Sequence, residues 1–229
     1  MGDSPATRIY AENYDDWVQL ANHKCFSDKQ LGAIKVVNGI VLPSRQFDFN
    51  DGGRYEGGVC DENLNFIAGN IRINEQDPGY LSVCRSYNVP KEEITFCDEE
   101  VIFGGVIIKW FGHVLGEGFG RCWYPMQYDR DKPIVFILLH DTVDIPGYVW
   151  EFFSLLGIKE RARFIHKPTK FLSVVVPDES IRFWGGFFTK EYLVPYEYIN
   201  QRIPHGNHKK IYLTRRKWGG GVQKIIYIV

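Results

Sequence analysis

The period of the hydrophobic pattern changes near Gly104, and this change constrains the fold more than any other feature of the sequence. Upstream of it, short apolar runs alternate with turn residues, as is typical of β-strands. Downstream, apolar residues recur at helical spacing over 111–126, and an unbroken apolar run at 134–139 has the character of a buried strand. Strands that alternate with helices form parallel sheets. The sequence therefore predicts an α/β fold, with a β-rich N-terminal part followed by alternating strands and helices.

The N-terminal part contains several short segments that predict strands. In residues 36–41, Asn38-Gly39 is the favoured two-residue turn and lies between β-branched pairs, which predicts a β-hairpin; a simple loop is the alternative. Residues 66–73 predict a further strand, and residues 101–103 a short strand that ends at Gly104-Gly105.

The second half contains helices with recognisable ends. One begins with Asp144 as the expected N-cap and Pro146 in its first turn, and ends at Gly157, where a C-cap glycine belongs. The other expected elements are a helix over 111–124, strands at 134–139, 163–165 and 171–176, a helix over 189–202 disturbed by Pro195, and a short strand at 211–213. In such a sheet, ligands bind at the carboxyl ends of the strands.

Charge and cysteine content argue against several classes of function. A net charge of −1 and a pI near 6.6 give no reason to expect a nucleic-acid partner or an anionic membrane surface. The five cysteines form no C-x-x-C pair, so we expect a reduced chain without structural zinc. No stretch has the apolar character of a signal peptide or of a transmembrane helix. We expect a cytoplasmic protein, with peripheral association at the inner membrane as the alternative.

The expected helix over 111–124 carries the most informative polar residues. His113, Glu117 and Arg121 are spaced i, i+4 and i+8, so they would line one face of the helix. Beyond Gly112, three more glycines interrupt the same stretch, at Gly116, Gly118 and Gly120. Each costs about 0.8–1 kcal/mol in a helix interior, which predicts close approach of a backbone or a ligand. The alternative is an exposed Glu117–Arg121 ion pair beside a structural histidine.

A basic segment extends from residue 205 to residue 224, with six Lys or Arg and no Asp or Glu. Within it, a short apolar strand leads into Arg215, Arg216, Lys217 and three glycines. Arginine forks and Gly-rich turns both bind phosphate, so the segment predicts a local anion site; a solvated basic tail is the alternative. Asp129 and Asp131 outline an acidic metal motif, but they lie in an expected surface turn, and we expect no metal site.

Five segments occur in the order and approximate spacing of one protein family. They are EVIFGG at 100–105, FGH at 111–113, EFFSLLGI at 151–158, VVVPD at 174–178 and IYLTR at 211–215. Together they resemble the bacterial members of glycosyltransferase family 61, of the capsular polysaccharide biosynthesis type. The resemblance covers about residues 30 to 217. It departs from the family where glycines replace bulkier residues and a serine in the helix after FGH.

The resemblance implies a two-domain GT-B architecture in which the acceptor-side domain comes first. Residues 1–208 are expected to form this α/β domain, and residues 209–229 either the start of a donor-binding domain or a closing strand. The family implies an inverting enzyme without a metal or other cofactor. Its expected partners are a nucleotide-sugar donor, UDP-linked in the better-known relatives, and a cell-surface glycan acceptor. Because few residues follow 208, we expect a piece of a longer protein or a shortened one.

The resemblance also suggests roles for the polar residues. An inverting transfer needs a base for the acceptor proton, and His113 is the first candidate because imidazole exchanges protons near neutral pH, with Glu117 second. Cationic side chains would meet the leaving diphosphate. The expected donor-binding residues are Arg121, Thr214, Arg215, Arg216 and Lys217. The alternative function is a noncatalytic glycan- or protein-binding domain that uses its high aromatic content of 15% as a stacking platform.

Overall fold

The computed structural model describes residues 27–48, 53–73, 81–139, 144–182 and 187–203, and two short strands further on. These are β9 (Ile211–Tyr212) and β10 (Ile226–Tyr227), which pair with each other in an antiparallel ladder separate from the main sheet. No helix within the described ranges is long and apolar enough to span a membrane.

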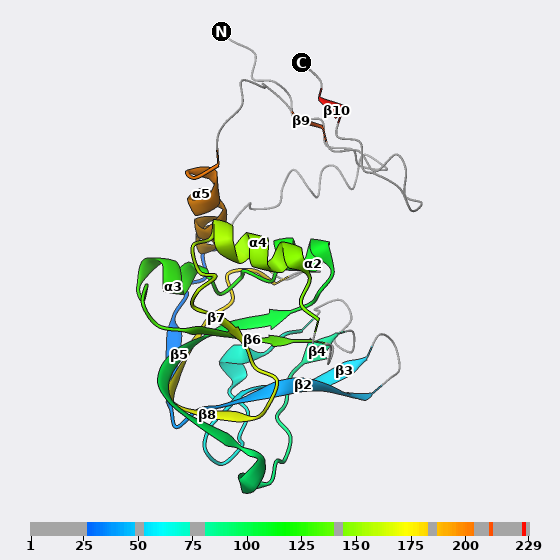
Figure 1. Cartoon of the computed structure of the whole chain (residues 1–229), viewed down its shortest axis with the longest axis vertical. Helices are drawn as coiled ribbons and strands as arrows, with labels where there is room; N and C mark the ends of the chain where they lie inside the picture. Colours follow the sequence, from blue (N-terminus) through cyan, green and yellow to red (C-terminus); the bar gives the residue numbers. More distant parts are fainter. Residues whose placement is uncertain are drawn as a thin grey trace.

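Eight strands form one mixed sheet in the order β4-β3-β2-β8-β5-β6-β7, and β1 also pairs with β8 (Figure 1). They are β1 (Ala33–Val37), β2 (Ile40–Asp48), β3 (Arg54–Cys60), β4 (Ser82–Val83), β5 (Thr95–Ile107), β6 (Ile134–Leu138), β7 (Ala162–Phe164) and β8 (Thr169–Pro177). Strands β8, β5, β6 and β7 are parallel to one another. The predicted α/β class and the parallel sheet in the second half are therefore confirmed.

The segment at Asn38-Gly39 is not a hairpin turn, so that prediction is wrong. Strands β1 and β2 follow one another along β8 in a single antiparallel register. The N–H of Asn38 donates to the carbonyl of Leu172 at 2.9 Å, and the N–H of Phe171 donates to the carbonyl of Gly39 at 2.9 Å. Asn38 has a φ of 54°. Asparagine tolerates this left-handed conformation, which is common in turns. Here it produces a kink between β1 and β2, which otherwise run on as one strand along β8.

Two other strand predictions need correction. Residues 66–73 do not form a strand but contain the 3-10 helix η1 (Ala68–Asn70), flanked by isolated bridges. A second 3-10 helix, η2 (Lys91–Glu93), precedes β5. Strand β5 does not end at Gly104-Gly105 but continues to Ile107 through a register shift. Gly105 has a φ of 112°, a backbone conformation that is costly for any residue with a side chain. The glycine therefore marks a bulge within β5 rather than the end of the strand.

The helices of the second half cover one face of the sheet (Figure 1). They are α2 (Phe111–Gly116), α3 (Trp123–Gln127), α4 (Gly147–Leu155), η3 (Lys190–Leu193) and α5 (Val194–Asn200). Gly157 has a φ of 68°, which confirms it as the glycine that ends α4, but the N-cap is Pro146 and not Asp144. Pro195 lies in the first turn of α5, so the expected helix over 189–202 begins as a 3-10 turn.

The single helix predicted over 111–124 does not exist. Helix α2 ends at Gly116 and α3 begins at Trp123, with turns between them. The segment after β8 docks on these turns, since the N–H and the hydroxyl of Ser180 donate to the carbonyl of Gly120 at 2.9 and 2.7 Å. A side chain at Gly120 would crowd Ile181, so the glycine serves the approach of the chain itself.

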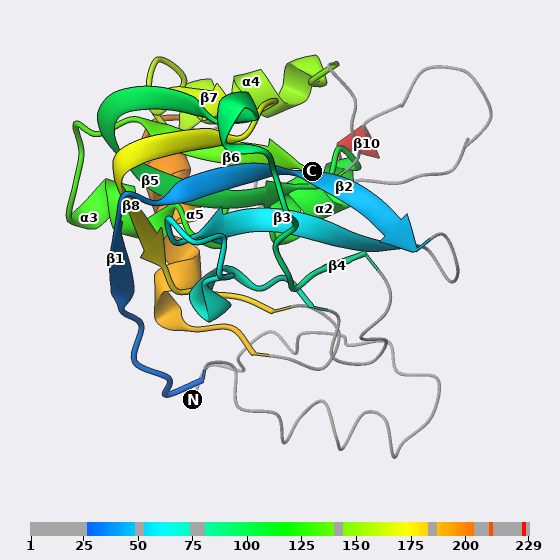
Figure 2. The ribbon, with the colours of Figure 1, turned by 90° about the horizontal axis from the view of Figure 1, so that it is seen from below.

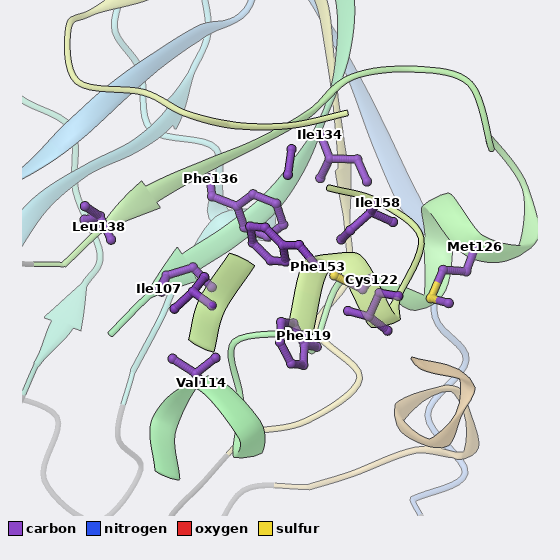
Figure 3. Close-up of a cluster of buried hydrophobic side chains, with 13 residues drawn as sticks. Ile107, Val114, Phe119, Cys122, Met126, Ile134, Phe136, Leu138, Phe153 and Ile158 are labelled. Atoms are coloured by element: carbon purple, nitrogen blue, oxygen red, sulfur yellow. The ribbon is translucent and has the colours of Figure 1, made fainter. Parts of the chain in front are cut away.

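Buried side chains fill both faces of the sheet. Between the sheet and α4, Phe136 of β6 stacks on Phe153 with ring centroids 4.8 Å apart (Figure 3). The other face carries a second cluster drawn mainly from β5, β6 and β8. Strands β2 and β3 belong to the part of the sheet that lies away from α4 (Figure 2). The sheet curls so that the hydroxyl of Ser44 in β2 reaches the carbonyls of Leu138 and Leu139.

Candidate functional site

A small pocket lies beside the second half of β5 and the carboxyl end of β8. The chain passes from β5 to β6 and β7 on one side of the sheet and then returns to β8 on the other side of β5, so the strand order reverses at β5. Such a position is where open α/β sheets bind ligands. Five charged side chains line the pocket, namely Arg72, Glu117, Arg121, Glu179 and Arg182, and its volume is about 20 Å³.

Glu117 and His113 are in direct contact at the end of α2. The N–H of Glu117 donates to the carbonyl of His113 at 2.9 Å, so the helical path extends one residue beyond α2 and places the two side chains together. His113 Nδ1 lies 2.5 Å from Glu117 Oε1. With the proton on Nδ1, Nε2 is the nitrogen that can accept another proton. The His113 side chain is 21% exposed, so the ring remains within reach of a ligand.

Arg72 contacts the same carboxylate oxygen of Glu117 as His113 does. Its Nη2 donates to Glu117 Oε1 at 2.7 Å, and its Nη1 donates to the carbonyl of Leu81. Burial opposes ionisation of Glu117, but the hydrogen bond from His113 and the charge and hydrogen bond of Arg72 outweigh it, so the pKa of Glu117 lies below its usual value. Glu117 is therefore an anion that fixes the orientation of His113.

Arg121 lies in the interior on the other side of the pocket. Its Nη1 donates to the carbonyl of Pro177, its Nη2 is 3.2 Å from Glu179 Oε1, and only 3% of its side chain is exposed. The bulge at Gly105 lies beside it, and a Cβ there would be in ordinary contact with Arg121 Cδ, at 3.5 Å. Burial raises the pKa of Glu179, although the charges of Arg121 and Arg182 oppose that rise.

The predicted residues are partly brought together. His113 and Glu117 are in contact, and Glu117 and Arg121 share the pocket, but not as one helical stripe. The charged partners are Arg72 for Glu117 and Glu179 for Arg121, rather than each other. Because the guanidinium of Arg121 is already engaged, its role in donor binding stays a prediction. The other expected donor-binding residues lie outside the described residues, at Thr214, Arg215, Arg216 and Lys217.

Arg72, Glu179 and Arg182 also line the pocket and were not expected there from the sequence. Arg72 lies in residues 66–73, which resembled a strand, and the two others follow the end of β8. A charged residue inside an apolar segment is a signal that a partner is needed, because an unpaired buried charge is costly. The sequence gives no spacing that links it to Glu117, 45 residues further along.

Two exposed aromatic residues flank the site at the start of α2. Trp110 is 46% exposed and Phe111 52% exposed. The ring centroid of Trp110 lies 5.4 Å from that of His113, and the ring of Phe111 packs edge-on against Tyr148 at 5.5 Å. The polar pair is therefore bordered by aromatic surface.

No group of His, Cys, Asp and Glu suited to a metal ion occurs within the described ranges. Asp129, considered above for a metal, pairs with Lys132 at 2.9 Å. Comparisons with family models, with curated proteins and with solved structures find no match for this chain.

Proposed function

We propose that the chain is the acceptor-side part of a glycosyltransferase of the family 61 type, with GT-B architecture. It transfers a sugar from a nucleotide-sugar donor, UDP-linked as in the better-known relatives, to a hydroxyl of a cell-surface glycan. The observation that carries the proposal is the contact between His113 and Glu117, with Arg72 holding the carboxylate. A base oriented by a second group is the arrangement that activates a hydroxyl nucleophile.

In this mechanism, His113 takes the proton of the acceptor hydroxyl. The acceptor oxygen attacks the anomeric carbon from the side opposite the diphosphate, the bond from that carbon to the diphosphate oxygen breaks, and its electron pair leaves with the diphosphate. The proton moves to Nε2 of His113, and Glu117 stabilises the resulting imidazolium through Nδ1. Arg72 keeps Glu117 ionised, so the carboxylate remains an acceptor throughout.

The donor binds away from the pocket in this proposal. A cavity of about 20 Å³ has room for one water or a group of similar size, so a nucleotide-sugar does not fit in it. The diphosphate is met by the basic segment that holds Arg215 and Arg216, with Thr214 and Lys217 beside them. Arginine forks suit the charge that develops on the leaving group.

A transfer assay with His113→Ala tests the proposal. UDP-sugars and glycan acceptors are offered to the full chain, and product is followed by mass spectrometry. We expect kcat to fall about 10²–10⁴-fold in His113→Ala, as for loss of a general base. The control is His166→Ala, an exposed histidine after β7, which we expect to leave kcat unchanged. Equal turnover by His113→Ala rules out the base, and failure of the unaltered chain to bind or turn over any donor rules out the transferase.

The exposed aromatic residues favour a second candidate, a glycan-binding domain without transfer activity. Trp110 and Phe111 offer flat apolar faces beside a polar pair, which suits stacking against a sugar ring. Calorimetry separates the two functions. Binding of an oligosaccharide that weakens in Trp110→Ala, together with no binding of UDP or UDP-sugars, supports this candidate over the enzyme. Tyr128→Ala, at an exposed aromatic position on another surface, is the control.

A further inference from the structure

A second cluster of charged side chains lies on β2, β3 and the segment after β4, and none of its residues lines the pocket beside Glu117. Its centre is Glu56 of β3, whose side chain is 10% exposed. Glu56 Oε1 accepts a hydrogen bond from Arg45 Nε at 2.5 Å, and Glu56 Oε2 accepts one from Arg85 Nε at 3.2 Å. One carboxylate therefore holds two guanidinium groups as neighbours, one on each of its oxygens.

Each of these two guanidinium groups also lies over an aromatic ring. The Cζ atom of Arg45 is 3.8 Å from the ring centroid of Tyr87. The Cζ atom of Arg85 is 3.5 Å from the ring centroid of Phe47. The hydroxyl of Tyr87 donates to the carbonyl of Pro43 at 3.0 Å, which fixes that ring. A guanidinium held by a ring on its face and by a carboxylate at Nε has already lost much of the rotamer freedom of an exposed arginine.

The outer ends of both arginines remain available. Within the described part of the chain, Nη1 and Nη2 of Arg45 and Arg85 make no hydrogen bond, and 55% and 53% of the two side chains are exposed. Arg163 differs, because both of its Nη atoms donate to Glu99. An ion pair of that kind occupies the whole guanidinium fork, whereas the two arginines at Glu56 are fixed through Nε and keep their outer forks for another acceptor.

The free donors define the chemistry of a ligand. Each outer fork presents two nitrogens in one plane, the geometry that binds oxygens of an oxyanion. A phosphate monoester has three terminal oxygens and can accept from two forks at once, whereas one fork satisfies both oxygens of a carboxylate. Asp48, the next acidic residue along β2, lies opposite Arg54 in the strand register and has an arginine of its own across the strands.

We propose that Arg45 and Arg85 form a binding site for a phosphate monoester, with Glu56 and the two aromatic rings holding the forks in place. The site shares no residue with the pair of His113 and Glu117, so it does not depend on sugar transfer. Two kinds of molecule carry this group, namely a soluble phosphate ester and the headgroup of a lipid such as phosphatidic acid. Both offer the same oxygens, and the experiments below separate them.

Calorimetry with the full chain tests the chemistry of the site. Inorganic phosphate and acetate are titrated at neutral pH and constant ionic strength. Charge-assisted hydrogen bonds from two forks predict a Kd for phosphate of about 1 mM or tighter. We expect acetate to bind at least about tenfold more weakly, because only one fork engages it. Equal affinity for the two anions overturns the proposal, and so does the absence of phosphate binding.

Substitutions locate the site. Arg45→Gln and Arg85→Gln each remove one fork, and we expect each to weaken phosphate binding about tenfold or more. The matched control is Arg163→Gln, which makes the same change of charge at a fork that Glu99 already occupies, and it should leave the affinity unchanged. An equal loss in the control means general surface charge and overturns the proposal. If Arg45→Gln does not fold, Arg85→Gln decides, because Arg85 lies outside the strands and is more exposed than buried.

A comparison of soluble and lipid phosphate identifies the source of the ligand. Glycerol phosphate is titrated into the chain, and cosedimentation is measured with vesicles of phosphatidylcholine that contain phosphatidic acid. Vesicles of phosphatidylcholine alone are the control. Cosedimentation that needs phosphatidic acid and is lost in Arg85→Gln assigns the site to a lipid headgroup. Binding of glycerol phosphate that is lost in Arg85→Gln, without cosedimentation, assigns it to a soluble ester. Binding of either that persists in Arg85→Gln overturns the site.

Discussion

Arg121 and Arg163 each contact one glutamate, but burial makes these two ion pairs different in energy. The Arg121–Glu179 pair is in the interior, and Arg121 also bonds the carbonyl at the end of β8. The Arg163–Glu99 pair lies at the surface, with 49% of the arginine side chain exposed. Removing one partner of a buried pair leaves an uncompensated charge, whereas water replaces the partner of an exposed one.

We therefore expect Arg121→Ala to lower the free energy of unfolding by about 3–5 kcal/mol. Arg163→Ala is the control and should cost less than about 1 kcal/mol. Urea denaturation of both variants at pH 7 measures the difference. Similar losses in the two variants would show that Arg121 does not hold Glu179 in the interior.

The two glutamates of the pocket give opposite dependences of stability on pH. The pKa of Glu117 lies below its unfolded value of about 4.3, so its stabilising contribution is present above about pH 5 and is lost as pH falls through the lowered pKa. The pKa of Glu179 is raised in the folded chain. Its contribution to stability is therefore most favourable below the pKa of the unfolded chain, and it declines as pH rises through the raised pKa of the folded chain.

The prediction concerns the free energy of unfolding between pH 6 and pH 3. Relative to the unaltered chain, Glu117→Gln should lose less stability as pH falls, because it lacks the carboxylate that must be protonated. Glu179→Gln should behave in the opposite way, so its free energy of unfolding should increase relative to that of the unaltered chain as pH rises. Urea titrations at several pH values measure both curves. A steeper acid loss in Glu117→Gln would contradict the charged network around Arg72.

At the scale of elements, the break between α2 and α3 is the most informative feature. An unbroken helix over 111–124 would gain from every Gly→Ala change, because glycine is about 0.8–1 kcal/mol less favourable than alanine. The turns between α2 and α3 change this at Gly118, where a Cβ would lie 2.8 Å from the carbonyl oxygen of Val114. At Gly112, inside α2, a Cβ would meet nothing within 4 Å.

Gly112→Ala should consequently raise the free energy of unfolding by up to about 1 kcal/mol. Gly118→Ala should lower it by about 1–3 kcal/mol through crowding. The same substitution thus has opposite signs at two positions six residues apart, and thermal or urea unfolding of the pair measures it. Stabilisation by both changes would favour the continuous helix.

The elements that the sequence predicts well are those with local causes. An apolar run predicts β6, and Gly157 ends α4 because its conformation suits glycine. The elements predicted wrongly depend on partners far away in the chain. β1 and β2 continue along β8 across Asn38-Gly39, because β8 offers backbone groups on both sides of the kink. The turns after α2 form because Ser180 docks on Gly120. Neither partner is visible in the local pattern.

At the scale of the whole molecule, the candidate site depends on three distant segments. The contact between His113 and Glu117 follows from their i, i+4 spacing, because the helical path continues to Glu117 at the end of α2. Arg72 comes from the β-rich part and Glu179 from the segment after β8, and only the order of strands brings them to one pocket. Sequence spacing holds no information about such an approach, so the contact of Arg72 with Glu117 and the anionic state of Glu117 could not be predicted from it.

The curl of the sheet depends on one buried hydroxyl. Ser44 of β2 is 4% exposed and lies 2.7 Å from the carbonyl of Leu139, with the carbonyl of Leu138 also in reach, so it joins β2 to the end of β6. Ser44→Ala should cost about 1–3 kcal/mol, because it removes the one O–H that donates to a buried carbonyl here. Hydrogen exchange should accelerate in β2 and around Leu138. Ser180→Ala removes a similar buried bond at 2.7 Å but away from this junction, so it should leave exchange in β2 unchanged. If both variants accelerate exchange across the whole sheet alike, the curl is not held at Ser44.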